Sequence, residues 1–203
     1  GTAVLLAGPA LSGKRELLLS LLASGGADGR GTVFVTTRRD GDATARALAE
    51  RGVPTDLISV VDCVSRGSSF DRVRDAPGRR YVADPGDLTG IGIAVTEFLR
   101  EHRRHGRTPW FACHSLSTTV MYADVRAVFR FLHVTLGRVR DADGIAVAAL
   151  DGATVSDADR AVLAQPFDGL LEVREREGRD EIRARGVPVA PRSWTPVRTA
   201  PEF

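Results

Sequence analysis

Short apolar runs alternate with longer segments of helical periodicity over the first 150 residues of the chain. The runs predict buried strands at 3–7, 32–37, 57–62, 110–113 and 145–150. The segments between them predict helices at 15–23, 42–51, 87–104 and 125–140. Such an alternation is typical of a parallel sheet with helices on both faces. We therefore expect an α/β fold of three layers around a mostly parallel, twisted sheet.

The pattern changes after residue 150. Ser156 and Asp159 have the spacing of a capping box and predict a short helix that ends near residue 164. Apolar and charged residues alternate over 170–175 and 181–185 on either side of Gly178, which predicts an antiparallel hairpin at the edge of the sheet.

The 203 residues are expected to form a single domain. Within it we distinguish a parallel core (1–150), a short helix with the edge hairpin (151–186) and a proline-rich tail (187–203), which we expect to lie irregularly on the surface. Residues 64–80 are rich in Gly, Ser, Arg and Asp and are predicted to form a long loop.

Composition narrows the functional classes. A hydrophobic content of 43%, a charged content of 27% and a net charge of +2 are ordinary for a soluble protein and argue for neither nucleic acid nor membrane. The sequence contains no apolar run of membrane-spanning length, so a cytoplasmic location is the expectation. Cys63 and Cys113 lie in apolar runs and are predicted to be buried small side chains, with neither a disulfide nor a metal site.

One motif carries specific chemistry. The segment GPALSGK at 8–14 matches G-x-x-x-x-G-K and stands directly between a predicted strand and a predicted helix. In that setting, successive backbone N–H groups and the helix N-terminus form a cradle for phosphate, and Lys14 reaches the β- and γ-phosphates. Lys14 is the single lysine among 28 basic residues. The plainer alternative is a glycine turn with an unrelated lysine.

The next position departs from the motif. A phosphate loop normally continues with Ser or Thr, whose hydroxyl binds Mg²⁺, whereas this chain has Arg15, which has no acceptor atom. Either Arg15 points away and leaves Mg²⁺ to phosphates and water, or its guanidinium neutralises phosphate in place of the metal. Both alternatives predict weak hydrolysis.

A second diagnostic position is also substituted. The apolar run at 110–113 is followed by His114, where a Walker B strand would end in Asp, and a neutral imidazole is a poor ligand for Mg²⁺. His114 is interpreted either as a hydrogen-bonded histidine at a strand end or as a residue near the γ-phosphate. In the second case His114, Ser115 or Ser117 would position water or sense phosphate.

These segments resemble a known family. HSLSTTVMYADVRAVFRFLHVTLGRVRDADGIAVAALD from residue 114, GPALSGKREL upstream and FDGLLEVRE downstream look like the KaiC/GvpD-like RecA-superfamily ATPase homologues of halophilic archaea. The resemblance also covers VVDCV at 60–64 and DLTGIGIAVTEFL at 87–99. It implies a RecA-like P-loop core, a nucleotide at the strand–helix loop and a regulatory role.

The resemblance also implies site residues. The nucleotide-binding set is Gly8, Pro9, Ala10, Leu11, Ser12, Gly13, Lys14, Arg15 and Ser115. A RecA-type catalytic carboxylate would lie near the end of the second strand, where Asp40 is the nearby acid, so Asp40 and His114 are the candidate catalytic residues. Asp62 ends the third strand and is interpreted as a capping or turn aspartate. Arg38 and Arg39 lie near the same edge and are candidates to contact phosphate or the nucleotide of a neighbouring subunit.

The function that this set favours is a regulatory protein that binds nucleotide, ATP or ADP, with weak or absent hydrolysis and without a defined Mg²⁺ site. The alternatives are an ATPase with unconventional metal ligation, a scaffold with an empty loop, and a recombinase-like DNA-binding partner. The near-neutral charge and the absence of aromatics among the basic segments, such as 102–107, argue against nucleic acid. Assembly with further copies or with a protein partner is left open.

Overall fold

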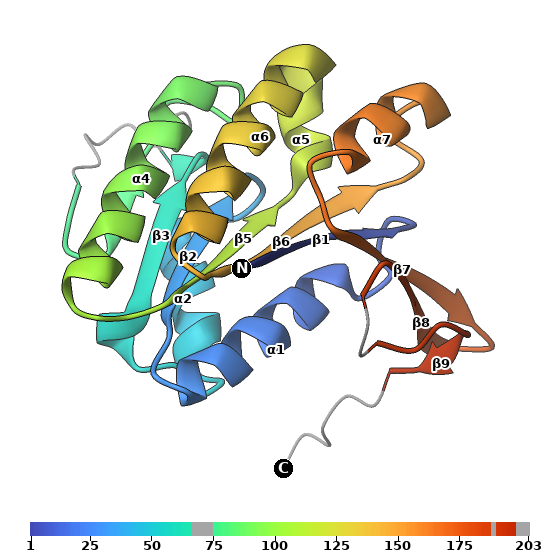
Figure 1. Cartoon of the computed structure of the whole chain (residues 1–203), viewed down its shortest axis with the longest axis horizontal. Helices are drawn as coiled ribbons and strands as arrows, with labels where there is room; N and C mark the ends of the chain where they lie inside the picture. The colour runs from blue at the N-terminus through green and yellow to red at the C-terminus, as the bar shows by residue number, and fades with distance from the viewer. Residues whose placement is uncertain (66–74, 188–189, 198–203) are drawn as a thin grey trace.

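A nine-stranded sheet runs through the part of the chain that the computed structural model describes, residues 1–65, 75–187 and 190–197 (Figure 1). The strand order is β4-β3-β2-β5-β6-β1-β7-β8-β9, parallel from β4 to β7 and antiparallel from β7 to β9. The strands are β1 (Thr2–Gly8), β2 (Gly31–Thr36), β3 (Ile58–Asp62), β4 (Arg79–Tyr81), β5 (Pro109–His114), β6 (Ile145–Asp151), β7 (Gly169–Arg176), β8 (Arg179–Arg185) and β9 (Thr195–Pro196). The predicted parallel sheet with a C-terminal antiparallel hairpin is confirmed.

Helices cover both faces of this sheet (Figure 1). On one face lie α1 (Lys14–Ala27) and α2 (Gly41–Ala49), and the short helix η1 (Thr55–Leu57) precedes β3. On the other face lie α4 (Leu88–Arg104), α5 (Leu116–Tyr122), α6 (Val125–Asp141) and α7 (Asp157–Ala164). Successive strand residues point to opposite faces. Leu5 accordingly packs into the core under α4 and α6, and Leu6 into the core under α1 and α2.

The predicted elements agree with the observed ones except where an element is short. The loop expected at 64–80 falls partly on 66–74, outside the described residues, and its end is wrong because β4 begins at Arg79 and pairs with β3. The seven-residue α5 was not predicted. The proline-rich tail is not wholly irregular, because β9 pairs with β8 as a third antiparallel strand.

The remaining structural expectations concern single residues. Ser156 caps α7 by accepting a hydrogen bond from the backbone N–H of Asp159 at 3.1 Å. Cys63 and Cys113 are both free and buried, as predicted. Within the described ranges, each helix lacks the length or the apolarity needed to cross a membrane.

Asp62 is fully buried at the end of β3 and organises the turn that follows. Its carboxylate accepts hydrogen bonds from the backbone N–H groups of Gly41 (2.6 Å), Val64 (2.7 Å) and Ser65 (2.9 Å), and from the Ser65 hydroxyl (2.6 Å). The interpretation of Asp62 as a turn aspartate is confirmed. Through Gly41, the same carboxylate holds the start of α2 against β3.

Replacing Asp62 by Ala should lower the free energy of unfolding by roughly 3 kcal/mol or more, because three backbone N–H groups lose a common acceptor. Asp62→Asn keeps one acceptor oxygen and should fall between Asp62→Ala and the unmodified chain. Urea denaturation measures both effects. The exposed Asp141→Asn serves as the control and should stay within about 0.5 kcal/mol of the unmodified chain. Equal stability of Asp62→Ala and Asp141→Asn would refute this account of Asp62.

Candidate nucleotide site

The register of the sheet brings the ends of four strands to one edge. Gly8 at the end of β1 lies opposite Asp151 at the end of β6, and Thr36 at the end of β2 lies opposite His114 at the end of β5. The loop after β1 leads directly into α1, whose N-cap is Gly13 in the left-handed conformation (φ 64°). A helix N-terminus with its free N–H groups therefore faces the edge where open α/β sheets bind ligands.

A cavity of about 470 Å³ opens at this edge, within the usual range for small-molecule sites. It is lined by Ala10, Leu11, Ser12, Gly13, Lys14, Arg15, Glu16, Arg38, Arg39, His114, Ser115, Ala149 and Asp151. The structure thus brings the loop together with His114 and Ser115, which lie roughly 100 residues further along the chain. Gly8 and Pro9 do not line the cavity, and their carbonyl oxygens accept hydrogen bonds from Nζ of Lys14.

The ammonium group of Lys14 is bound by the loop itself. The side chain is buried, and Nζ donates hydrogen bonds to the carbonyl oxygen of Gly8 (3.0 Å), the hydroxyl of Ser12 (3.2 Å) and the carbonyl oxygen of Pro9. Burial lowers the pKa of Lys14, and the charge of Arg38 adds to this effect while Asp151 opposes it. All three donors of the ammonium group are therefore used inside the loop.

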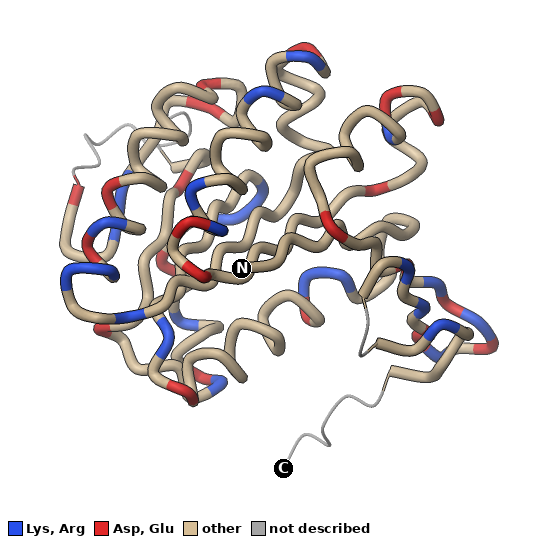
Figure 2. Tube along the Cα trace, viewed as in Figure 1, with Lys and Arg blue, Asp and Glu red and all other residues tan. Residues whose placement is uncertain are grey.

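Further cations line the cavity. The start of α1 is positively charged (Figure 2). Arg15 follows Lys14 at the start of α1 and pairs with Glu16 at 3.0 Å. Arg38 and Arg39 are exposed, and within the described part of the chain neither pairs with a carboxylate. The cavity consequently has an excess of positive charge on its walls.

His114 is neutral at pH 7. Burial and the neighbouring charges of Arg15, Arg38 and Lys14 lower its pKa to about 4. Its position is fixed by Thr37, whose backbone N–H donates to the His114 carbonyl oxygen at 2.9 Å and whose hydroxyl accepts from the N–H of Ser115 at 2.7 Å. An uncharged imidazole here can accept or donate one hydrogen bond per ring nitrogen but supplies no charge.

The predicted hydroxyls and acids have different positions. Ser115 lines the cavity, whereas the Ser117 hydroxyl accepts a hydrogen bond from the N–H of Asp151 at 2.7 Å. Asp40 is the N-cap of α2, where its carboxylate accepts from the N–H of Ala43 at 2.7 Å, and it does not line the cavity. The structure therefore does not bring Asp40 together with the loop residues.

Asp151 is an acid of the cavity lining that the sequence prediction missed. It ends β6, which pairs with β1, and its carboxylate also accepts from the N–H of Ala153 at 3.1 Å. The signal was present in the sequence, because the apolar run at 145–150 ends in Asp as a Walker B strand does. Asp151 enters the cavity through the strand order, which places β6 directly beside β1 and which the sequence does not display.

The donor set does not fit a protein-held Mg²⁺ but fits a polyanion. Arg15 offers no lone pair where a Ser or Thr hydroxyl is expected, and His114 stands among cations. Of the two acids in the lining, Glu16 is paired with Arg15 and Arg51, which leaves Asp151 as the carboxylate without an ion pair in the described part of the chain. Backbone N–H groups, Lys14 and arginines are, in contrast, the groups that bind phosphate.

Comparison with known proteins supports the fold. A family model described as "Family of unknown function (DUF7504)" matches residues 1–173. No curated protein matches the sequence.

Two solved structures are similar to the chain. One is the uncharacterized protein PH0321 from Pyrococcus horikoshii, crystallised in complex with an unknown peptide (TM-score 0.68, 15% identity, 91% of this chain and 82% of that chain). The other is the KaiC-like protein PH0186 from Pyrococcus horikoshii OT3 (TM-score 0.66, 15% identity, 96% of this chain and 84% of that chain). The expected KaiC-like RecA fold is thereby confirmed, while the halophilic branch and the ATPase relationship stay predictions.

His114 should make the fold sensitive to acid. Its folded pKa of about 4 lies below the unfolded value of about 6.5, so between these values the unfolded chain binds a proton that the folded chain does not. Stability is therefore lost as the pH falls from 6.5 towards 4, by an amount on the order of 3 kcal/mol. His114→Gln should remove this part of the loss of unfolding free energy. Urea denaturation at pH 7.5, about one unit above the unfolded pKa, and at pH 4, near the folded pKa, measures it. The exposed His133→Gln is the control, and an acid loss in His114→Gln equal to that of the unmodified chain would contradict the assignment.

Proposed function

The chain belongs to the family of unknown function DUF7504, and from its phosphate loop we propose that it is a regulatory protein that binds ATP or ADP and hydrolyses it weakly or not at all. The observation that carries the proposal is the convergence of the loop N–H groups, Lys14 and three arginines on one cavity at the carboxyl edge of the sheet. The similarity in fold to the KaiC-like protein PH0186 is consistent with it.

The shape of the loop supports phosphate binding. Leu11 and Gly13 both have left-handed backbones (φ 63° and 64°), and alternation of this kind turns successive N–H groups into an anion-binding concavity. The Leu11 side chain is 99% exposed, so it projects out of the loop instead of filling it. The interior of the loop holds the Lys14 ammonium group and the buried hydroxyl of Ser12, which donates to the carbonyl oxygen of Pro9 at 2.9 Å.

Lys14 must exchange a partner when phosphate enters. Its three donors now bind neutral oxygens of Gly8, Pro9 and Ser12. A phosphate oxygen is a charged acceptor, and hydrogen bonds between two charged groups are roughly twice as strong as neutral ones. The exchange therefore favours the bound nucleotide, and the polar contacts of the free loop keep the buried ammonium group satisfied until then.

The charge on the cavity wall supports binding over turnover. Arg15 and Arg38 offer planar donors that suit phosphate oxygens, and they do so without a metal ion. Hydrolysis normally depends on Mg²⁺ that bridges the β- and γ-oxygens. With Arg15 and His114 at the two usual positions of Mg²⁺ coordination, turnover should be slow. Slow turnover suits a protein whose nucleotide state controls assembly or a partner.

Isothermal titration of the full chain with ATP, ADP and GTP tests this proposal, each with Mg²⁺ and with EDTA. We expect ATP or ADP to bind in both conditions, with affinities that differ by less than about tenfold, 1.4 kcal/mol. Lys14→Ala should weaken binding roughly 10- to 100-fold, because a charge-assisted hydrogen bond contributes about 1.5–3 kcal/mol. Arg15→Ser should weaken binding in EDTA and make it depend on Mg²⁺.

Arg103→Ser, an exposed arginine at the end of α4, is the matched control and should bind as the unmodified chain does. Failure of all three nucleotides to bind, or binding that strictly requires Mg²⁺ in the unmodified chain, would refute the proposal.

The second candidate is a slow ATPase, which the presence of Asp151 in the cavity favours. A carboxylate beside Lys14 is the group that could orient a water molecule or contribute to a Mg²⁺ shell supplied mainly by phosphates and water. Asp40, the acid expected from the resemblance, caps α2 instead and is the competing choice.

Phosphate release by a coupled assay separates these two acids. If the chain is an ATPase, Asp151→Asn should lower the rate about 100-fold, while Asp40→Asn should leave it within a few-fold of the unmodified rate. Lys14→Ala should abolish release in either case. The same loss in both aspartate variants, or a larger loss in Asp40→Asn, would exclude Asp151 as the acting carboxylate.

A further inference from the structure

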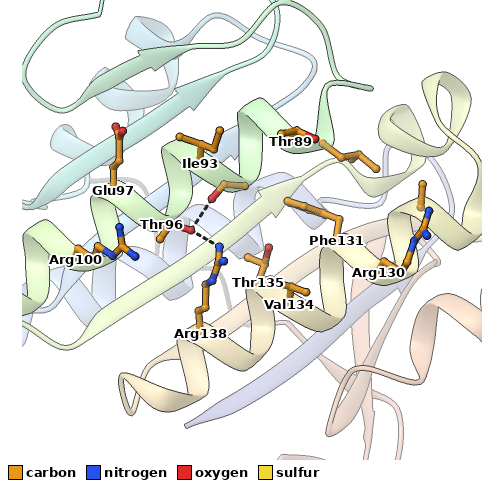
Figure 3. Close-up of a pocket in the computed structure, with 13 residues that line it drawn as sticks. Thr89, Ile93, Thr96, Glu97, Arg100, Arg130, Phe131, Val134, Thr135 and Arg138 are labelled. Carbon is orange, nitrogen blue, oxygen red and sulfur yellow. Dashed lines mark hydrogen bonds between the residues drawn. The ribbon is translucent and has the colours of Figure 1, made fainter.

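A groove separate from the nucleotide site lies between α4 and α6, on the opposite face of the sheet from α1 (Figure 3). Its volume is about 630 Å³. Its apolar floor contains Ile93 from α4, 57% exposed, and Val134 from α6, 48% exposed, with Phe131 beneath them. Exposed apolar side chains that line one groove from two helices form a contact surface, unlike isolated ones.

The rim of this groove carries unpaired positive charge. Arg100 on α4 and Arg130 and Arg138 on α6 lie along it, with Arg100 and Arg130 towards opposite ends (Figure 3). Within the described residues, none of these three guanidinium groups pairs with a carboxylate, and Arg138 instead donates a hydrogen bond to the hydroxyl of Thr96. The acid on the rim, Glu97, is already paired with Arg80 at 3.1 Å.

We propose that this groove binds an amphipathic helix of a protein partner, with apolar residues on one face and carboxylates on its flanks. A helix that lies between two helices packs its i, i+3 and i+4 side chains into the groove, and here they would cover Ile93 and Val134. Flanking Glu or Asp side chains would pair with Arg100 and Arg130, which suits the unbalanced charge of the rim.

The charge pattern selects this occupant over two others. A second copy of the chain, docked through the same groove about a twofold axis, would place arginines against arginines, which is unfavourable. A nucleic acid would satisfy the arginines but leave Ile93 and Val134 without an apolar partner, and the groove floor offers no exposed aromatic ring for base stacking. An acidic amphipathic helix satisfies both the rim and the floor.

Fluorescence anisotropy with the full chain and two labelled synthetic peptides tests the proposal. Both peptides have the 17-residue length of α4 and α6 and a leucine face, and they differ only in carrying Glu or Lys on the flanks. The Glu peptide should bind, more weakly as salt is added, and the Lys peptide should not.

Variants locate the binding. Ile93→Ser and Val134→Ser should each weaken the Glu peptide about tenfold, as expected for contact residues near the centre of an interface. Arg130→Glu should lower the affinity for the Glu peptide by more than about tenfold and should raise the affinity for the Lys peptide. Arg126→Glu is the matched control, because Arg126 is exposed and lies on the same helix outside the groove. This variant should bind the Glu peptide with the same affinity as the unmodified chain. Circular dichroism verifies that each variant is folded.

The proposal is overturned if the Glu peptide does not bind, if the Lys peptide binds equally well, or if Arg126→Glu and Arg130→Glu lose the same affinity. It is also overturned if sedimentation shows self-association that Ile93→Ser abolishes, because the groove would then hold a second copy. The nucleotide experiments above can fail without affecting this result, since the groove lies between α4 and α6 and the phosphate loop lies at the carboxyl edge of the sheet, and the two share no lining residue.

Discussion

The parallel pairing of β1 with β6 is the constraint on which the site depends. The register runs without interruption from Thr2 opposite Ile145 to Gly8 opposite Asp151, so the phosphate loop starts beside the carboxylate at the end of β6. Because β5 is the other neighbour of β6, the same pairing places His114 at the far wall of the cavity. Parallel strands need long crossover connections, and these connections put α1 and α2 on one face of the sheet and α4 to α7 on the other.

The electrostatics of the cavity follow from that arrangement. Lys14 and three arginines line a partly buried cavity in which Asp151 is the acid without an ion pair among the described residues. Two features of the structure reduce the repulsion among these positive charges. The Lys14 ammonium group turns back onto the oxygens of its own loop, and His114 stays uncharged, with a pKa lowered by burial and by its basic neighbours. Both features limit the cost of crowded positive charge. If the proposed function is correct, a bound anion would neutralise the remaining positive charge of the site.

Much of this could be predicted from the sequence, because the evidence was local. The apolar runs and the G-x-x-x-x-G-K spacing lie within short windows, and they located the strands and the loop between β1 and α1 correctly. Asp151 was missed because its importance comes from the order of strands, which places β6 between β5 and β1 and is not visible along the chain. The short β4 and α5 lack a full period of pattern. The groove is lined by Ile93 and Val134, which come from two helices roughly 40 residues apart in the chain, so no local pattern brings them together. The turn of Lys14 onto its own loop is a rotamer choice that no residue pattern encodes.

The cavity lies at the carboxyl edge of the sheet and the groove lies on the face covered by α4 and α6, yet a short stretch of chain joins them. β5 ends at His114 in the cavity, Ser115 is the N-cap of α5, and Asp124 caps α6, which forms one wall of the groove. Thr37 ties the start of this stretch to the end of β2. Continuity by itself is not coupling, which requires that a ligand favour one of two arrangements of these elements. If a ligand in the cavity shifts α5 and α6, it changes the affinity of the groove for its own ligand by some factor. Thermodynamic linkage then requires the groove ligand to change the affinity of the cavity for its ligand by the same factor.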